Sequence, residues 1–98
     1  MRGKMSEHFW QVRILKRIDR NLGKLPMPVL KALALLMREI ELSGPVRGNW
    51  PNYSRLGPKT HHCHLKKGRP TYVAVWIETN AGYEVEVTYV GTHEKAPY

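Results

Sequence analysis

The alternation of hydrophobic and polar positions divides the first third of the chain into a strand and a short helix. Hydrophobic residues alternate with polar ones over residues 10–14, the period of two that is typical of a half-buried strand. Ile18, Leu22 and Leu25 then recur at helical spacing. The Gly-Lys-Leu-Pro run at residues 23–26 predicts the end of this short helix.

A longer helix is predicted from Pro28 to the Ser-Gly-Pro run at residues 43–45. One stripe of this helix carries only hydrophobic residues, and most of its charged residues lie outside the stripe. The stripe consists of Val29, Leu33, Leu36 and Ile40. We interpret this stripe, like that of the shorter helix, as a face that covers a hydrophobic core.

Three strands are predicted in the C-terminal half of the chain, after an irregular stretch over residues 46–59. They cover residues 61–66, 71–78 and 83–90. The connecting segments at 67–70 and 79–82 are rich in turn-forming residues. Short turns between strands predict an antiparallel meander.

Together these elements predict an α+β fold. We expect a small antiparallel sheet, built from the N-terminal strand plus the C-terminal three-strand meander, with the two helices packed on one face. A chain of 98 residues can bury one such core, so residues 1–98 are expected to form a single domain. Because the helices cover one face only, a functional site is expected on the other, partly open face.

Charge is the first indication of function. Sixteen Lys and Arg side chains against eight Asp and Glu give a formal net charge of +8. Such an excess favours binding to polyanions such as nucleic acid, although a basic surface can also serve solubility alone. No apolar run is long enough to span a bilayer, and residues 1–8 do not resemble a signal peptide. We therefore expect a cytoplasmic protein with no membrane partner, and the single cysteine agrees with a reducing compartment.

The segment HHCHLKKGRP at residues 61–70 combines three histidines with the only cysteine and a cationic run. Side chains of a strand point alternately to opposite faces. The core side is therefore expected to carry His61, Cys63 and Leu65. The open face is expected to carry a row formed by His62, His64 and Lys66.

The ligand types in this segment suit zinc, but their spacing does not. Contiguous strand residues point to opposite faces, whereas structural zinc sites draw on separated pairs of ligands. Only His62 and His64 could converge, with His93 as a third candidate. We therefore expect no metal ion and no cofactor.

Several features of the chain resemble the RelE/ParE superfamily of bacterial toxins from toxin–antitoxin modules. They are the order of elements, the Lys-Leu-Pro break between the helices, the leucine and glycine before the second strand, and the ending VTYVGTHEKAPY. The resemblance extends from Phe9 to Tyr98. RelE-like members of the superfamily are ribosome-dependent mRNA endonucleases, and ParE-like members poison DNA gyrase.

The resemblance also assigns residues to the family pattern. The alternating basic residues of the family's second strand correspond to His62 and His64, with Lys66 next in the row. The basic residue after a Val-Gly pair and the final aromatic correspond to His93 and Tyr98.

One position departs from the family pattern. The arginine that begins the family's third strand falls on Pro70 in this chain, with Arg69 one place earlier. Lys95 follows the basic residue of the last motif.

Metal-free RNA cleavage requires such residues. The neighbouring 2′-hydroxyl attacks phosphorus, so a base must take its proton, an acid must protonate the leaving oxygen, and cations must stabilise the extra charge. Histidine titrates near neutrality and can act in either proton-transfer role. His62 and His64 are the candidate base and orienting group, and His93 is the candidate acid. Tyr98 would stack on a base or contribute its hydroxyl. The candidate phosphate-binding residues are Lys66, Lys67, Arg69 and Lys95.

Trp50 and Tyr53 lie in the irregular stretch and have two interpretations. Aromatic rings can stack on RNA bases, or they can cover the edge of a core beneath a loop. We favour the second interpretation.

The resemblance implies a toxin of a type II toxin–antitoxin module, a ribosome-dependent mRNA endonuclease that inhibits translation by metal-independent acid/base cleavage. Its implied partners are the ribosome, mRNA and a cognate antitoxin, expected to be a helix-turn-helix protein. Two alternatives remain open. One is a ParE-like DNA gyrase inhibitor without nuclease activity, and the other is a non-catalytic basic RNA-binding module.

Overall fold

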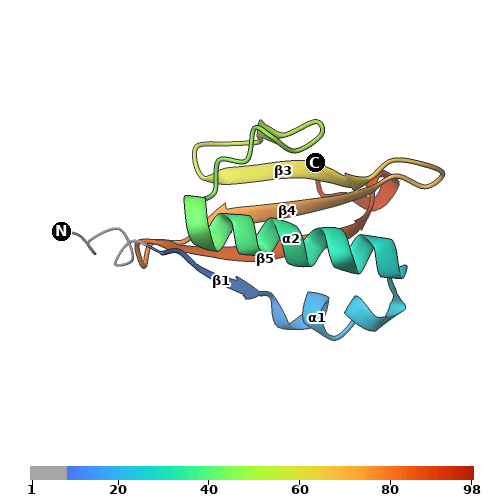
Figure 1. The fold of residues 1–98 in the computed structure, drawn as a ribbon, viewed down its shortest axis with the longest axis horizontal. Coiled ribbons are helices and arrows are strands. Elements are labelled where there is room, and N and C mark those ends of the chain that lie inside the picture. The colour runs from blue at the N-terminus through green and yellow to red at the C-terminus, as the bar shows by residue number, and fades with distance from the viewer. Residues whose placement is uncertain (1–8) are drawn as a thin grey trace.

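A computed structural model describes residues 9–98 of the chain, and it has the expected α+β architecture (Figure 1). Residues 1–8, for which no signal peptide is predicted, lie outside the described residues. The elements are β1 (Gln11–Ile14), α1 (Lys16–Asp19), η2 (Leu22–Lys24), α2 (Met27–Ser43), β2 (Ser54–Arg55), β3 (Thr60–Lys66), β4 (Tyr72–Glu78), β5 (Glu84–Thr92) and η3 (His93–Lys95). Within residues 9–98, no helix is long and apolar enough to cross a membrane.

The strands form one five-stranded sheet in the order β1-β5-β4-β3-β2. The predicted antiparallel meander is confirmed, because β3 pairs with β4 and β4 with β5 in antiparallel register. The prediction of a wholly antiparallel sheet is wrong, since β1 runs parallel to β5. Alternation along a strand reports which face each residue occupies but not the direction of the neighbouring strand. Parallel neighbours need a long connection. The chain between β1 and β5 meets this need, because it contains α1, α2 and three strands.

The first helical segment is shorter than its hydrophobic spacing predicts. Regular α-helix covers only Lys16–Asp19, and a separate 3₁₀ turn follows at Leu22–Lys24. The Asn21 side chain donates a hydrogen bond to the Arg17 carbonyl at 2.7 Å, and the Asn21 amide donates to Ile18. These bonds close the helix after about one turn. The helical spacing of the hydrophobic residues persists across the break.

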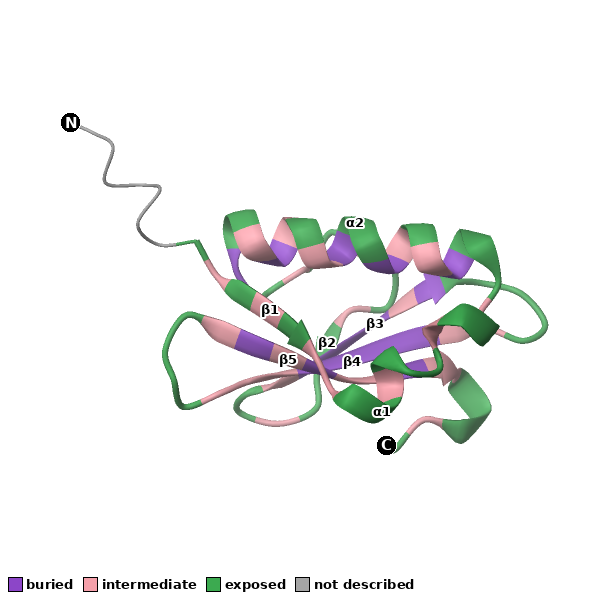
Figure 2. Cartoon of the chain, turned by 90° about the horizontal axis from the view of Figure 1, so that it is seen from below, coloured by how far each residue is buried: buried purple, intermediate pink, exposed green. Residues whose placement is uncertain are grey.

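Helix α2 covers one face of the sheet, and its predicted stripe is confirmed. All four side chains of the stripe are buried, namely Val29, Leu33, Leu36 and Ile40. They join a core cluster with sheet residues that include Cys63, Leu65, Ala74, Trp76, Val85 and Val87. Figure 2 shows the buried side of α2 turned toward the strands, with the segment after β5 on the other side of the sheet. Full burial of one such aliphatic side chain stabilises the fold by about 1.5–3 kcal/mol.

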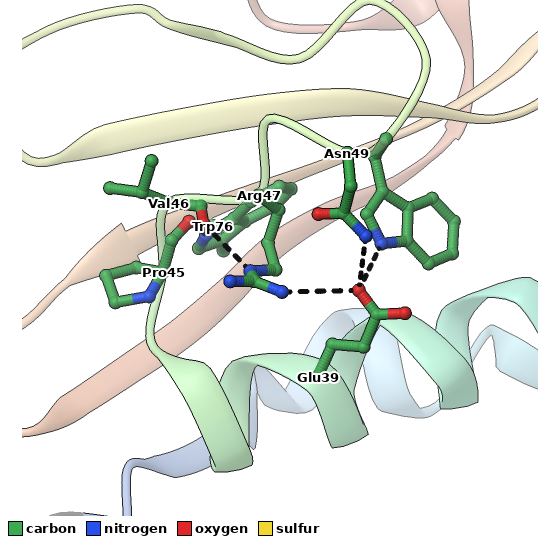
Figure 3. Close-up of polar contacts among 7 residues, drawn as sticks. Glu39, Pro45, Val46, Arg47, Asn49 and Trp76 are labelled. Carbon is green, nitrogen blue, oxygen red and sulfur yellow. Dashed lines mark hydrogen bonds and ion pairs between the residues drawn. The ribbon is translucent and has the colours of Figure 1, made fainter.

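The irregular stretch after α2 is tied to that helix through one carboxylate oxygen (Figure 3). Glu39 Oε1 accepts hydrogen bonds from Trp50 Nε1 at 2.8 Å, Asn49 Nδ2 at 2.9 Å and Arg47 Nη1 at 3.3 Å. The bonds from Asn49 and Trp50 in particular lower the pKa of Glu39. They hold the chain that leads into β2, and β2 in turn pairs with the histidine-rich strand β3.

Candidate active site

Strand β3 divides its histidines between the two faces as its alternation predicts. His61 is fully buried on the α2 side, where its ring stacks on Trp76 at a centroid distance of 5.8 Å. His62 and His64 pair in register with Val75 and Val73. Residues paired across antiparallel strands share a face, so these four lie opposite α2.

The open face is less open than the sequence implies. No described helix packs on it as α2 packs on the other, yet Val73 and Val75 are only 0% and 3% exposed. The segment after β5 returns across this face, and its Tyr98 ring lies 4.6 Å from the ring of His62. The aromatic rings thus shield the valines beneath them.

Four of the side chains that sequence reasoning selects as catalytic candidates lie together on this face. The centroid distances are 5.6 Å for His64 and His93, 5.9 Å for His93 and Tyr98, and 6.4 Å for His62 and His64. With the contact between His62 and Tyr98, these rings form a closed group, here called the histidine–tyrosine cluster. Residues 62 and 93, far apart along the chain, thereby share one site.

The end of β5 sets the position of His93. The His93 amide donates to the Thr71 carbonyl at 2.8 Å, and the Tyr89 hydroxyl donates to the Thr92 carbonyl at 2.7 Å. Gly91 leaves room for that hydroxyl, because a Cβ at this residue would lie 2.7 Å from the Tyr89 oxygen. The glycine of the Val-Gly pair therefore allows the bond that fixes the chain just before His93.

Ser54 on β2 holds the ring of His62. The His62 Nδ1 atom lies 3.1 Å from the Ser54 hydroxyl and 3.3 Å from the Ser54 carbonyl oxygen. A carbonyl can only accept, so this contact favours the tautomer with the proton on Nδ1 and the lone pair on Nε2. That tautomer suits a general base. The role of Ser54 has no signal in the sequence, because it depends on the pairing of β2 with β3.

His64 is held in its neutral form. Burial lowers the pKa of His64, and electrostatic interactions with His93, His62 and Lys67 lower it further. Its Nδ1 atom is buried and has no hydrogen-bond partner among the described residues. The Tyr98 pKa is raised, chiefly by burial, so its hydroxyl keeps its proton near neutral pH.

An open depression of about 820 Å³ adjoins the cluster. Two members of the cluster, His64 and His93, line it together with the cationic side chains Arg69 and Lys95, whereas His62 and Tyr98 do not. Arg69 therefore lies beside the cluster, although it stands one place before the position of the family arginine. Glu94, which the sequence-based selection omits, also lines the depression, and its place directly after His93 is the only signal that could have found it.

Lys66 and Lys67 are exposed and do not line this depression. The predicted row of His62, His64 and Lys66 is interrupted, because the register of β3 and β4 shifts between His64 and Lys66. Such a bulge breaks the regular alternation of faces on which the prediction of the row depends.

His61 lies outside the cluster, on the core side. Its Nε2 donates to the Glu78 carboxylate at 2.7 Å, and its Nδ1 accepts from the Tyr53 hydroxyl at 2.6 Å. Burial lowers the pKa of His61 despite the carboxylate. Tyr53 and Trp50 both pack against the core cluster, which supports their interpretation as the covered edge of the core.

No group of three or more His, Cys, Asp and Glu side chains within residues 9–98 is arranged to hold a metal ion. Cys63 is fully buried, and burial raises the pKa of its thiol to about 12. The thiol is therefore protonated, and it lies on the opposite side of the sheet from the cluster. A protonated thiol is a poor metal ligand.

The fold agrees with the family resemblance. No protein-family model and no curated protein sequence matches the chain. Among solved structures, it is similar to a chain of the archaeal RelE–RelB complex from Pyrococcus horikoshii OT3, with a TM-score of 0.65 and 12% sequence identity. The match covers 90% of this chain and 99% of the other. The chain therefore has a RelE-like fold.

Proposed function

We propose that the protein is the toxin of a type II toxin–antitoxin pair and cleaves mRNA on the ribosome. The observation that carries this proposal is the histidine–tyrosine cluster beside a depression lined by Arg69 and Lys95. Acid/base groups and phosphate-binding cations are the two requirements of metal-independent RNA cleavage. The RelE-like fold also supports the proposal.

In the proposed reaction, the Nε2 atom of His62 takes the proton from the 2′-hydroxyl, and the resulting oxyanion attacks the adjacent phosphorus. The bond to the 5′-oxygen breaks, and His93 donates a proton to that oxygen. Arg69 and Lys95 stabilise the added negative charge on phosphorus. The products are a 2′,3′-cyclic phosphate and a free 5′-hydroxyl.

The remaining members of the cluster orient the reacting groups. Neutral His64 lies in ring contact with both His62 and His93 and adds no charge of its own between them. Tyr98 contacts the same two rings and is 48% exposed, so an RNA base can stack on it. Lys66 and Lys67 remain candidates for phosphate contacts farther along the RNA.

The proposal includes partners. A cognate antitoxin, expected to be a helix-turn-helix protein, would bind the toxin and hide its positive charge, while ribosome and mRNA would be its targets. The similar archaeal structure is itself a complex of RelE with RelB. A protein that acts on translating ribosomes would work in the cytoplasm.

Single-turnover cleavage of mRNA on the ribosome tests the proposal with the wild type, His93→Ala and His93→Gln. Loss of a positioned general acid should lower the cleavage rate by roughly 10²–10⁴-fold. Thermal melts run alongside should change little, because His93 is exposed and such substitutions typically shift stability by less than about 0.5 kcal/mol.

Two outcomes would contradict the proposal. Full cleavage by well-folded His93 variants would remove this residue from the reaction. Absence of mRNA cleavage by the wild type, together with DNA breaks trapped on gyrase, would indicate that DNA gyrase is the target.

A further inference from the structure

Glu94 is an acidic side chain without an evident structural role. Five other glutamates in residues 9–98 have polar partners, namely Glu39, Glu41, Glu78, Glu84 and Glu86. Within this described part of the chain, Glu94 forms no ion pair and no hydrogen bond through its side chain. Asp19 is likewise unpaired there, but it lies on α1, away from the depression.

The surroundings of Glu94 make its lack of a partner informative. Glu94 lines the same depression as Arg69 and Lys95, yet no ion pair joins it to either cation. All three side chains are exposed, so each is available to a ligand. A carboxylate in a phosphate-binding depression repels the phosphate, because both carry negative charge. Its useful partner must therefore be a part of the RNA that donates hydrogen bonds.

We infer that Glu94 is a specificity-determining residue that binds the Watson–Crick edge of an unpaired guanine. This inference rests on the proposed function and names the base that the site prefers. Among the four RNA bases, guanine alone presents two adjacent donors on that edge, N1–H and the N2 amino group. A carboxylate has two acceptor oxygens in the matching arrangement. In adenine, cytosine and uracil, an acceptor stands beside the donor and would face the carboxylate.

One nucleotide can satisfy the whole depression. Its phosphate carries negative charge for Arg69 and Lys95, and its base carries donors for Glu94. A volume of about 820 Å³ lies within the range of small-ligand pockets. Single-stranded RNA is usually recognised in this manner, through splayed bases that are read on their Watson–Crick edges. A base bound beside His93 would also set the position of the neighbouring phosphate.

Binding of short RNA to the full chain tests this inference without requiring cleavage or ribosomes. The probes are fluorescently labelled hexamers of 2′-O-methyl uridine with G, A, C, U or inosine at one central position, measured by fluorescence anisotropy. The 2′-O-methyl group removes the nucleophile, so the probes stay intact. The wild type should bind the G probe more tightly than the A probe by roughly 5- to 150-fold, the usual discrimination of a bidentate contact to a base. Inosine lacks the N2 amino group and should fall between them.

The variant Glu94→Gln should lose this preference while its affinity for the all-uridine probe stays equal or rises. Glutamine keeps one acceptor but replaces the other by a donor. Asp19→Asn is the matched control, because it removes an equally unpaired carboxylate outside the depression and should keep the preference for G.

The possible outcomes separate this inference from the proposed function. Equal binding of the G and A probes by the wild type overturns the role of Glu94, and so does a preference for G that survives in Glu94→Gln. Failure to bind any probe also overturns it, whereas the ribosomal cleavage assay judges the nuclease proposal independently. A preference for G that depends on Glu94, in a protein that cleaves no mRNA, would leave base recognition standing and remove the nuclease activity.

Discussion

Gly91 provides a direct test of how the end of β5 positions the site. An alanine Cβ at this residue would lie 2.7 Å from the Tyr89 oxygen and 3.0 Å from the ring carbon that bears it. The Tyr89 oxygen cannot simply move away, since it donates a hydrogen bond to the Thr92 carbonyl at 2.7 Å. Gly91→Ala should therefore displace the Tyr89 ring, break that bond and shift the segment that carries His93.

The magnitude follows from two contributions. Forcing a methyl group into an occupied site typically costs about 1–3 kcal/mol. Loss of the hydroxyl bond alone, as in Tyr89→Phe, should cost about 0.5–1.5 kcal/mol. In the double variant Gly91→Ala/Tyr89→Phe the hydroxyl oxygen is absent, so the 2.7 Å clash disappears, although the ring carbon remains 3.0 Å from the added Cβ. Its destabilisation should therefore fall short of the sum of the single variants by at least about 0.5 kcal/mol.

Urea unfolding of the wild type, both single variants and the double variant measures this coupling. Gly23→Ala is the matched control, because beyond its own chain neighbours no heavy atom of the described residues contacts its Cβ position within 4 Å. It should change the free energy of unfolding by less than about 0.5 kcal/mol. Additive effects in the double variant would refute the reasoning, as they would mean that Tyr89 does not resist the added methyl group.

Two further predictions concern groups outside the cluster. Burial lowers the pKa of His61 below its ordinary value of 6.5, so between these two values the unfolded chain binds more protons than the native one and stability rises with pH. Urea unfolding from about pH 5 to pH 7.5 should show this rise, and His61→Gln should flatten it; an unchanged slope in the variant would contradict the assignment. Glu39→Ala removes the shared acceptor of three donors and should lower the free energy of unfolding by about 1.5–3 kcal/mol, the range for bonds to a charged group. Glu39→Gln retains one acceptor oxygen and should cost less in the same measurement, whereas equal losses would argue against the hydrogen bonds as the cause.

Local patterns in the sequence were sufficient for most of the fold. The helical stripe of α2 and the alternation of β3 each follow from the direction in which neighbouring side chains point. The stripe placed α2 on the core, and the alternation placed His61 on one face with His62 and His64 on the other. Local patterns failed where an irregularity interrupts them, as at the bulge between His64 and Lys66 and at the break after α1.

The candidate site was predictable only as a set of residues. The resemblance to the RelE/ParE superfamily, together with the acid/base chemistry of histidine, selected His62, His64, His93 and Tyr98. Nothing in the sequence selected Ser54, because its contact with His62 depends on the register of a two-residue strand. Arg69 illustrates the same limit, since one position of offset in the sequence did not prevent it from reaching the depression.

The sequence by itself thus determined most of the elements, their order, the faces of the strands and the chemical types of the candidate residues. The tertiary structure alone decided the parallel pairing of β1 with β5, the return of Tyr98 over His62 and the meeting of His64 with His93. The physical reason is the range of the forces involved. Backbone sterics and side-chain direction act between near neighbours in the chain, and they leave a periodic signal. Register and ring contacts join residues far apart in the chain, and they are selected only when the whole core packs at once.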